Sequence, residues 1–525
     1  MKVLVSDNLG EAGLKIFDQE PEIDVDVKTG LGPDEIKKII GEYDALVIRS
    51  ATKVTEELLT AAKKLRAIGR AGIGLDNVDI PAATKRGILV MNTPTGNVIT
   101  TAEHTIAMMM ALTRNIPWGT SSLKDGKWEK KILQGREVYN KVLGIIGFGK
   151  IGSIVADRAR GLKMQVIVHD PYIPDEQIAK AGFEAVSLED LYRRSDYITV
   201  HVPKLKDTVG LLNRKAFDQM KEGVMIINCA RGGIVDEADL NEALRSGKVA
   251  GAALDVFESE PPGVCPLFEI DRVICTPHLG ASTFEAQSNV AVQVAEQIIA
   301  FLKNGTIINA VNVPPVSREL LEKLEPYLTL ADRMGCLLAQ LSQRAIKEVM
   351  IEYVGDFEHL DLSPVTAVLK GLMTPMVKDD VNFVNAQILA KERGIKITET
   401  KVAQSEEYLN LITVTAISEA DQNKVAGTIF GRKNPRVLNI NNFRLELAPI
   451  GRFILIRNHD KPGAIGSIGT LLGDHGINIS RMRVGQEEGS DNTMIFLRTN
   501  PPIAENLMEK LRKLPLIISV RAFEL

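Results

Sequence analysis

The sequence has 525 residues, of which 45% are hydrophobic and 25% charged, proportions that fit globular domains and exclude a wholly disordered chain. At about 150 residues per domain, this length predicts three or four domains. The formal net charge of −4 gives no global electrostatic reason to expect binding to nucleic acid or to a membrane surface.

The apolar stretches, the first residues and the cysteines of the sequence bear on membrane insertion, secretion and metal binding. The longest apolar stretch, residues 106–112, is far shorter than the roughly 20 residues that a membrane-spanning helix needs. The first residues, MKVLVSD, are typical of a β-strand and lack the pattern of a signal peptide. The four cysteines are scattered without metal-binding spacing, so we expect no metal site and a reducing, cytoplasmic compartment.

The first ninety residues alternate short β-branched runs with helical patterns, which predicts a parallel sheet covered on both faces. We expect strands at residues 2–6, 23–28, 45–48, 66–69 and 88–91, and helices at 11–17, 33–41, 55–63 and 80–85. A long apolar helix is expected at 102–114, ending before Pro117.

The alternation starts again at Lys141 and predicts a second doubly wound sheet. Its expected strands are residues 142–146, 165–170, 197–200, 224–228, 252–256 and 273–276. An amphipathic helix at 282–303 is long enough to return to the first sheet, so we expect the first domain to be discontinuous. After a mixed α/β stretch, residues 452–525 show the β-α-β-β-α-β order of a ferredoxin-like unit.

One glycine-rich turn has the pattern of a phosphate-binding turn. Gly147-Phe-Gly149-Lys150-Ile151-Gly152 is the only GxGxxG pattern, and it joins a predicted strand to a predicted helix. Glycines in this pattern permit the turn, make room for a pyrophosphate and let the helix approach the strand. Asp170 lies 18 residues after Gly152 and can accept the ribose hydroxyls, which favours NAD over NADP. The alternative is an ordinary glycine-rich loop with a capping aspartate.

Ligands of an open α/β sheet bind beyond the carboxyl ends of its strands. The second sheet offers there His201-Val202-Pro203, Cys229-Ala230-Arg231, Asp255, Glu260, and His278 with Gly280. A guanidinium can hold a substrate carboxylate and an imidazole can move a hydroxyl proton, so the set suits hydride transfer. Spacing leaves open whether His201 or His278 is the acid–base, and whether Glu260 is instead a loop cap. His104, in the apolar helix, is interpreted as a satisfied core histidine.

The strings GFGKIG, HVP, NCARGGIVDE, AALDVFESEPP and TPHLGAST, in this order, resemble the D-isomer-specific 2-hydroxyacid dehydrogenases. With GRAGIGLDNVD, NTPTGN, LKDGKW and the C-terminal unit, the chain is similar to the long form of the D-3-phosphoglycerate dehydrogenase family. The resemblance implies two doubly wound parallel-sheet domains, an intervening α+β domain and a ferredoxin-like ACT domain. The implied domains are a substrate domain at 1–98 and 283–310, an NAD-binding domain at 99–282, a regulatory domain at 311–450 and the ACT domain at 451–525.

The resemblance also implies the catalytic roles and so selects between the two histidines. Arg231 is expected to bind the substrate carboxylate, and Glu260 to support His278, which exchanges the proton with the C2 oxygen. The predicted cofactor site consists of Gly147, Gly149, Lys150, Ile151, Gly152, Asp170, His201, Val202, Pro203, Cys229, Ala230, Arg231, Asp255, His278 and Gly280. Arg49, Ser50, Gly74 and Asn97 are expected to face the substrate together with Arg231 and His278.

The implied reaction is NAD-dependent oxidation of 3-phospho-D-glycerate to 3-phosphooxypyruvate, the first step of the phosphorylated route to L-serine. In the ACT domain, Asn458, Asp460 and Asn478 are the expected contacts of a serine effector. The basic loop at 123–131 implies a homo-oligomer, a dimer or tetramer, in which that loop reaches a neighbouring subunit. Two alternatives stay open, namely a dehydrogenase of another D-2-hydroxy acid and a non-catalytic NAD sensor.

Overall fold

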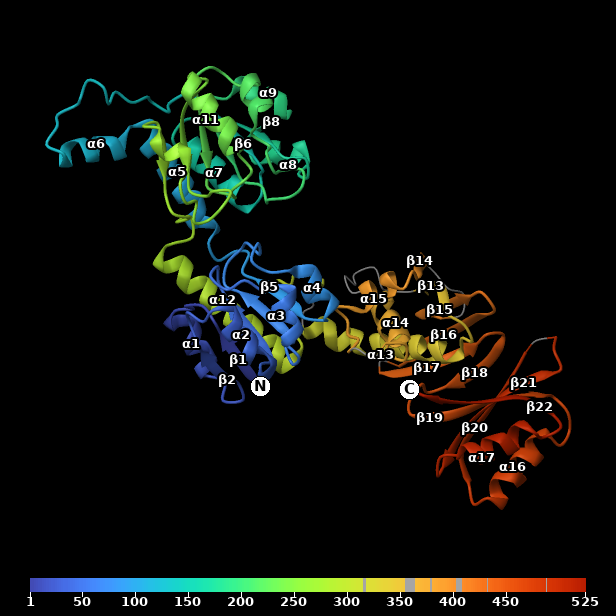
Figure 1. The fold of residues 1–525 in the computed structure, drawn as a ribbon. Coiled ribbons are helices and arrows are strands. Elements are labelled where there is room, and N and C mark those ends of the chain that lie inside the picture. Colours follow the sequence, from blue (N-terminus) through green and yellow to red (C-terminus); the bar gives the residue numbers. More distant parts are fainter. Residues whose placement is uncertain (315–317, 355–363, 378–379, 403–407, 432, 488) are drawn as a thin grey trace. The chain divides into compact units, whose positions relative to one another are not determined.

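The computed structural model describes the chain except for residues 315–317, 355–363, 378–379, 403–407, 432 and 488 (Figure 1). The chain divides into two compact units. The first comprises Met1–Leu9, Gly13–Asn92 and Val294–Leu525, and the second comprises Gly10–Ala12 and Thr93–Gln293.

The first unit begins with a parallel sheet in the order β2-β1-β3-β4-β5. Its strands are β1 (Lys2–Val5), β2 (Asp24–Val27), β3 (Ala45–Ile48), β4 (Ala67–Arg70) and β5 (Leu89–Asn92), connected by α1 (Glu11–Asp18), α2 (Pro33–Ile39), the 3₁₀ turn η1 (Ile40–Glu42), α3 (Glu56–Ala61) and α4 (Ile80–Lys85). The side chains of Thr55 and Asp79 accept amide hydrogen bonds and so cap α3 and α4. Gly69 of β4 faces Val294 and Ile298 of α12 (Phe284–Asn304), so the C-terminal half of that helix packs on this sheet.

The second unit is built on a seven-stranded parallel sheet in the order β12-β11-β10-β9-β6-β7-β8. Its strands are β6 (Val142–Ile146), β7 (Gln165–His169), β8 (Glu184–Ala185), β9 (Tyr197–Val200), β10 (Val224–Asn228), β11 (Val249–Leu254) and β12 (Val273–Cys275). Its helices are α5 (Val98–Thr113), α6 (Ile116–Lys124), α7 (Lys150–Gly161), α8 (Asp175–Lys180), α9 (Leu188–Arg194), α10 (Arg214–Gln219), α11 (Glu237–Ser246) and the 3₁₀ turn η2 (Pro266–Glu269). Ile145 packs with α5 and α7, whereas its neighbour Ile146 packs with α9, α10 and α11, so helices cover both faces.

The helix α6 and the strand β8 of this unit were not predicted. Pro117 was interpreted only as the end of the preceding helix, but it lies in the first turn of α6, where its missing N–H is not needed. Asn115, with φ of 53°, makes the break between α5 and α6. The strand β8 is two residues long, too short for any periodicity to show.

The rest of the first unit contains two further sheets. A mixed sheet in the order β14-β13-β15-β16-β17-β18 is packed against three helices. Its elements are α13 (Arg318–Leu341), β13 (Ile346–Val354), α14 (Pro364–Met373), α15 (Ala386–Glu392), β14 (Lys396–Val402), β15 (Leu411–Ser418), β16 (Gln422–Phe430), β17 (Asn434–Ile440) and β18 (Phe443–Leu447).

The last sheet is antiparallel, in the order β20-β21-β19-β22. Its elements are β19 (Arg452–His459), α16 (Ala464–Asp474), β20 (Asn478–Gln486), β21 (Asn492–Asn500), α17 (Glu505–Arg512) and β22 (Ile517–Glu524). Leu472 of α16 and Leu511 of α17 share one core with the strands, and both helices lie on one face of the sheet (Figure 1). The predicted fold class, including the ferredoxin-like unit, is confirmed.

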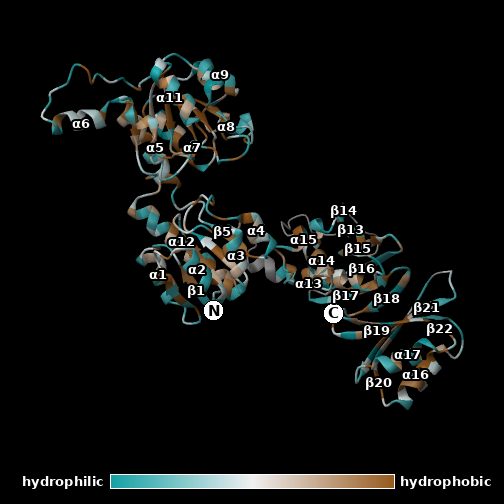
Figure 2. Ribbon diagram, viewed as in Figure 1, coloured by the Kyte–Doolittle hydropathy of each residue, from teal (hydrophilic) through white to brown (hydrophobic). Residues whose placement is uncertain are grey.

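Hydrophobic residues concentrate on the central strands of the two parallel sheets, such as β3, β6, β9 and β10, while many helix residues are hydrophilic (Figure 2). None of the helices in the described part of the chain combines the length and the apolar character that a membrane crossing requires.

Candidate active site

The glycine turn after β6 has the shape that its sequence predicts. Gly147 has φ of 95°, and a Cβ there would come within 2.6 Å of the His201 carbonyl oxygen. A Cβ on Gly152 would lie 2.0 Å from the Gly147 carbonyl oxygen, so this glycine allows α7 to approach the strand. A Cβ on Gly149 would meet no atom within 4 Å, which leaves open space at the start of α7. The first N–H groups of a helix have no intrahelical partner, so this space can receive a phosphate.

Asp170, after β7, is held beside that turn. Its Oδ2 accepts the Phe148 amide at 2.7 Å and its Oδ1 accepts the Tyr172 amide at 2.9 Å. Both oxygens keep lone pairs for ribose hydroxyls, because an ionised carboxylate has about four acceptor positions. The turn and the carboxylate therefore fit the diphosphate and ribose of a dinucleotide.

His201 follows β9 and lies against the glycine turn. Its Nε2 is 3.0 Å from the Thr199 Oγ1, and desolvation lowers the pKa of this imidazole to about 4. Such a ring stays neutral at physiological pH, so it is suited to a wall of the site rather than to proton exchange. A Cβ on Gly147 would also lie 2.9 Å from a methyl carbon of Val202, and Pro203 follows on the same segment.

Glu260 and His278 form a pair. The His278 Nδ1 is 2.7 Å from the Glu260 Oε2, and the other carboxylate oxygen accepts the Phe257 amide at 3.2 Å. A carboxylate can only accept, so Nδ1 carries the hydrogen and Nε2 is left for a substrate. Both side chains remain partly exposed, 48% for His278 and 38% for Glu260, as expected for groups that meet a ligand.

Arg231 is positioned by the turn after β10. Its Nη1 donates to the Ala230 carbonyl oxygen at 2.7 Å, and its guanidinium is half-buried. The buried Asn228 holds the turn by accepting the Ala230 amide and donating to the Arg231 carbonyl oxygen, both at 3.0 Å. Asn228 was not predicted as a functional residue, although it is the first residue of the NCARGG string. Because β10, β11 and β12 are parallel neighbours, the segments bearing Arg231, Glu260 and His278 leave the same edge of the sheet.

Asp255 organises the segment that carries His278. Its carboxylate, fully buried, accepts the Leu279 amide at 2.7 Å and the Gly280 amide at 2.8 Å. Burial alone would raise the pKa of Asp255, but hydrogen bonds from His104, Thr276 and these two amides lower it below its ordinary value. Burial, with the charge of Asp255 nearby, raises the pKa of the Cys229 thiol to about 12, so that cysteine is an uncharged packing group.

The predicted substrate contacts are divided between the two units. Arg49, Ser50 and Gly74 belong to the first, where the Arg49 amide donates to Asp7 at 2.6 Å and its carbonyl oxygen accepts Asn77 at 2.7 Å. Asn97 belongs to the second unit and is buried, with an Oδ1 that has no hydrogen-bond partner among the described residues. The approach of Arg49, Ser50 and Gly74 to His278 stays a prediction.

The predicted effector residues of the last sheet differ in accessibility. Asn458 is buried, where its Oδ1 accepts the Thr493 hydroxyl and its Nδ2 donates to the His459 carbonyl oxygen, both at 2.9 Å. Asp460 is exposed and accepts the Gln486 amide at 2.9 Å, and Asn478 is exposed at the start of β20. Two of the three side chains are therefore open to a ligand.

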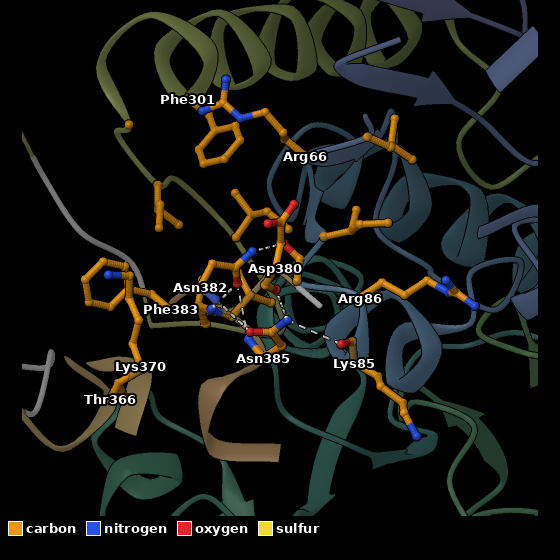
Figure 3. Close-up of a pocket in the computed structure, with 18 of the residues that line it drawn as sticks. Arg66, Lys85, Arg86, Phe301, Thr366, Lys370, Asp380, Asn382, Phe383 and Asn385 are labelled. Atoms are coloured by element: carbon orange, nitrogen blue, oxygen red, sulfur yellow. Dashed lines mark hydrogen bonds between the residues drawn. The ribbon is translucent and has the colours of Figure 1, made fainter. Parts of the chain in front are cut away.

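A cavity of about 1550 Å³ lies elsewhere in the first unit and includes none of the predicted site residues (Figure 3). Asn382 donates to the Gly87 carbonyl oxygen at 2.9 Å, and Lys85 pairs with Glu392 at 2.8 Å. These contacts attach the mixed-sheet part of the unit to α4 and to the loop between α4 and β5.

Three family models match the chain. Residues 106–280 match the NAD-binding domain of D-isomer specific 2-hydroxyacid dehydrogenases, 323–441 the D-3-phosphoglycerate dehydrogenase intervening domain, and 452–516 the ACT domain. The seven-stranded sheet, its glycine turn and the histidine–glutamate pair thus define an NAD-dependent dehydrogenase of the D-isomer-specific 2-hydroxyacid class.

Relatives extend the match to nearly the whole chain. The D-3-phosphoglycerate dehydrogenase of Synechocystis sp. is 43% identical over 98% of this chain and 92% of its own. That of Archaeoglobus fulgidus is 43% identical over 100% of both chains. The crystal structure of D-lactate dehydrogenase from Aquifex aeolicus, complexed with NAD and lactic acid, is 28% identical with a TM-score of 0.53, covering 60% of this chain and 100% of that one. The chain belongs to the D-3-phosphoglycerate dehydrogenase family.

Proposed function

We propose that the protein oxidises 3-phospho-D-glycerate at C2 with NAD, giving 3-phosphooxypyruvate at the entrance to serine biosynthesis. The observation that carries the proposal is the 2.7 Å pair between His278 and Glu260, at the same sheet edge as the dinucleotide turn. The relatives named for this reaction cover the chain end to end, which supports this substrate over a simpler hydroxy acid.

NAD binding would use the residues around the open space at Gly149. The amides of Lys150, Ile151 and Gly152 would meet the diphosphate and Asp170 the adenosine ribose. The segments at 201–203, 229–231 and 278–280 would line the nicotinamide end, next to the buried Asp255. The bound nicotinamide supplies the acceptor for the hydride that leaves C2.

The proton follows a separate path on the protein. His278 takes the hydroxyl proton on Nε2, the nitrogen that Glu260 leaves free, while the C2–O bond becomes a carbonyl. The carboxylate of Glu260 stabilises the imidazolium that forms. Arg231 holds the substrate carboxylate in two parallel hydrogen bonds, which orients C2. Base catalysis of this kind contributes about 10²–10⁴-fold.

Three assignments belong to the same proposal. We divide the chain at 1–98 with 283–310, 99–282, 311–450 and 451–525, supported by the packing of Val294 and Ile298 on the first sheet. We expect a homo-oligomer, dimer or tetramer, since Trp128 and Ile132 beyond α6 are 81% and 75% exposed. We place the protein in the cytoplasm, because its four cysteines are free thiols.

The test follows NADH absorbance with 3-phosphoglycerate, glycerate and lactate in parallel. We expect turnover with phosphoglycerate to exceed the other two by at least tenfold in kcat/KM. Higher kcat/KM with lactate or glycerate would assign another 2-hydroxy acid, and NADH binding without turnover on any of the three would indicate a sensor.

We also propose serine as an effector of the last sheet, through the exposed Asp460 and Asn478. Millimolar L-serine is expected to lower turnover and raise the thermal midpoint, because a ligand that binds only the folded state stabilises it. D-Serine is the matched control. If L-serine changes neither quantity, the effector assignment is wrong.

A further inference from the structure

The helix α5 holds the catalytic loop at two points. The Thr101 Oγ1 lies 3.1 Å from the Gly280 carbonyl oxygen and 3.0 Å from the Asn97 carbonyl oxygen, and its one hydrogen is shared between them. One turn further along the same helix face, the His104 Nε2 lies 3.2 Å from the Thr276 Oγ1 and 3.2 Å from the Asp255 Oδ1. The segment between these two contacts, 276–280, contains His278.

His104 is the donor in this contact. The carboxylate of Asp255 has no hydrogen to give, and the Thr276 hydroxyl gives its own hydrogen to that carboxylate. The remaining hydrogen must come from the Nε2 of His104. Its side chain is 19% exposed, so water does not readily replace it.

The loop needs this support because its backbone is unusual. His278 has φ of 54°, in the left-handed region that residues other than glycine rarely adopt. Its amide donates to the Asp255 carbonyl oxygen at 2.9 Å, and the next two amides donate to the carboxylate of the same residue. Asp255 therefore holds the backbone of three consecutive residues, 278–280, by hydrogen bonds. His104 is the side chain from outside this loop that holds Asp255 in place.

We propose that His104 is a positioning residue for the acid–base His278, acting through Thr276 and Asp255. The predicted effect of His104 on turnover rests on the proposed function, whereas its predicted effect on the structure of the loop does not. A displacement of about 1 Å of a reacting group can cost about 10²-fold in rate. We therefore expect loss of the His104 donor to lower kcat about 10- to 100-fold, with KM changed less than threefold.

The variants are His104→Gln and His104→Asn. Glutamine carries an N–H donor about as far from the backbone as Nε2, whereas the same amide in asparagine is too short to reach Asp255. Gln is expected to keep most of the turnover and Asn to lose it. Equal loss, or no loss, in the two variants would overturn the proposal. Tyr192→Phe, which removes a side-chain hydrogen bond from α9 in the same unit, is the control and is expected to behave as wild type.

A double-mutant cycle separates positioning from a general structural role. In the His278→Ala background, His104→Asn is expected to lower the residual rate less than threefold, because the group it positions is already gone. The same factor in both backgrounds would show that His104 acts independently of His278.

Amide hydrogen exchange of the ligand-free protein gives a readout that needs no activity. We expect the Leu279 and Gly280 amides to exchange at least tenfold faster in His104→Asn, and at the wild-type rate in His104→Gln and Tyr192→Phe. Unchanged exchange in His104→Asn would refute the positioning role even in an active enzyme. If the wild type turns over none of the hydroxy acids while exchange responds as expected, the proposed function fails and the positioning of the loop stands.

Discussion

Replacing Glu260 by glutamine tests the proton path most directly. The substitution keeps the size of the side chain and removes the negative charge that lies 2.7 Å from the His278 Nδ1. Two unit charges about 4 Å apart attract by about 4 kcal/mol near a protein surface and by about 1 kcal/mol in water. Because both side chains are partly exposed, we take about 1–3 kcal/mol as the stabilisation of the imidazolium that is lost.

At about 1.36 kcal/mol per factor of ten, that loss predicts a fall in kcat of roughly 5- to 150-fold. The assay is steady-state NADH formation at saturating NAD, with NADH affinity measured separately by fluorescence and expected to stay within twofold. Glu258→Gln, an exposed carboxylate two residues away, is the matched control and is expected to retain wild-type turnover. A Glu260→Gln enzyme within twofold of wild-type kcat would refute the view that this carboxylate supports the imidazolium.

Three other predictions follow from the geometry. Gly152→Ala is expected to lower the thermal midpoint because its Cβ would lie 2.0 Å from a carbonyl oxygen, whereas Gly149→Ala should keep the midpoint and weaken NADH binding in a fluorescence titration; the reverse pattern would contradict the assigned turn. His201→Gln is expected to preserve the pH dependence of turnover near neutrality, since the pKa of His201 is about 4; loss of that dependence would return His201 to the acid–base role. A hydrogen bond from Tyr43 lowers the pKa of Asp26 from 3.8 to about 2, so its carboxylate stabilises the fold above pH 4 and loses that effect as pH falls through 2. Asp26→Asn should therefore cost up to about 2 kcal/mol at pH 7 in denaturant titrations and little below pH 2; an equal loss at both would contradict the pKa.

The sequence predicted those parts of the site that depend on chain order in a parallel sheet. Arg231, Asp255 and His278 follow three neighbouring strands, β10, β11 and β12, and the carboxyl ends of parallel strands meet at one edge of a sheet. The glycine turn was predictable because each glycine has a separate role. Gly147 allows a positive φ, Gly149 leaves open space, and Gly152 allows close approach of α7 to the strand. Residue spacing could not decide whether His201 or His278 is the acid–base, because the pKa of a histidine depends on its burial in the folded chain.

The contacts that sequence reasoning could not supply are those between a helix and a distant loop. His104 was interpreted as a core histidine satisfied by its surroundings. The structure does give it partners, Asp255 and Thr276, but both lie more than 150 residues away along the chain. Nothing in the pattern of an apolar helix indicates which loop will pack across it. Asn228 illustrates the same limit at short range, since a turn is recognisable in sequence but the side chain that ties it is not.

The position of Asp255 was predictable from the sequence, but its hydrogen-bond partners were not. It follows β11, where the sequence indicates a ligand-facing group, yet its buried carboxylate is occupied by donors from the loop and from α5. Each donor that it holds lowers its pKa against the opposing effect of burial, and together they keep the pKa of Asp255 below its ordinary value. The chain at His278 is in a left-handed conformation, and Glu260 engages Nδ1, so Nε2 is the ring nitrogen that can meet a substrate. A carboxylate fixed in this way can keep the His278 imidazole in place without contacting it. We therefore expect substitutions of a residue that holds Asp255, such as His104, to change turnover more than substrate binding.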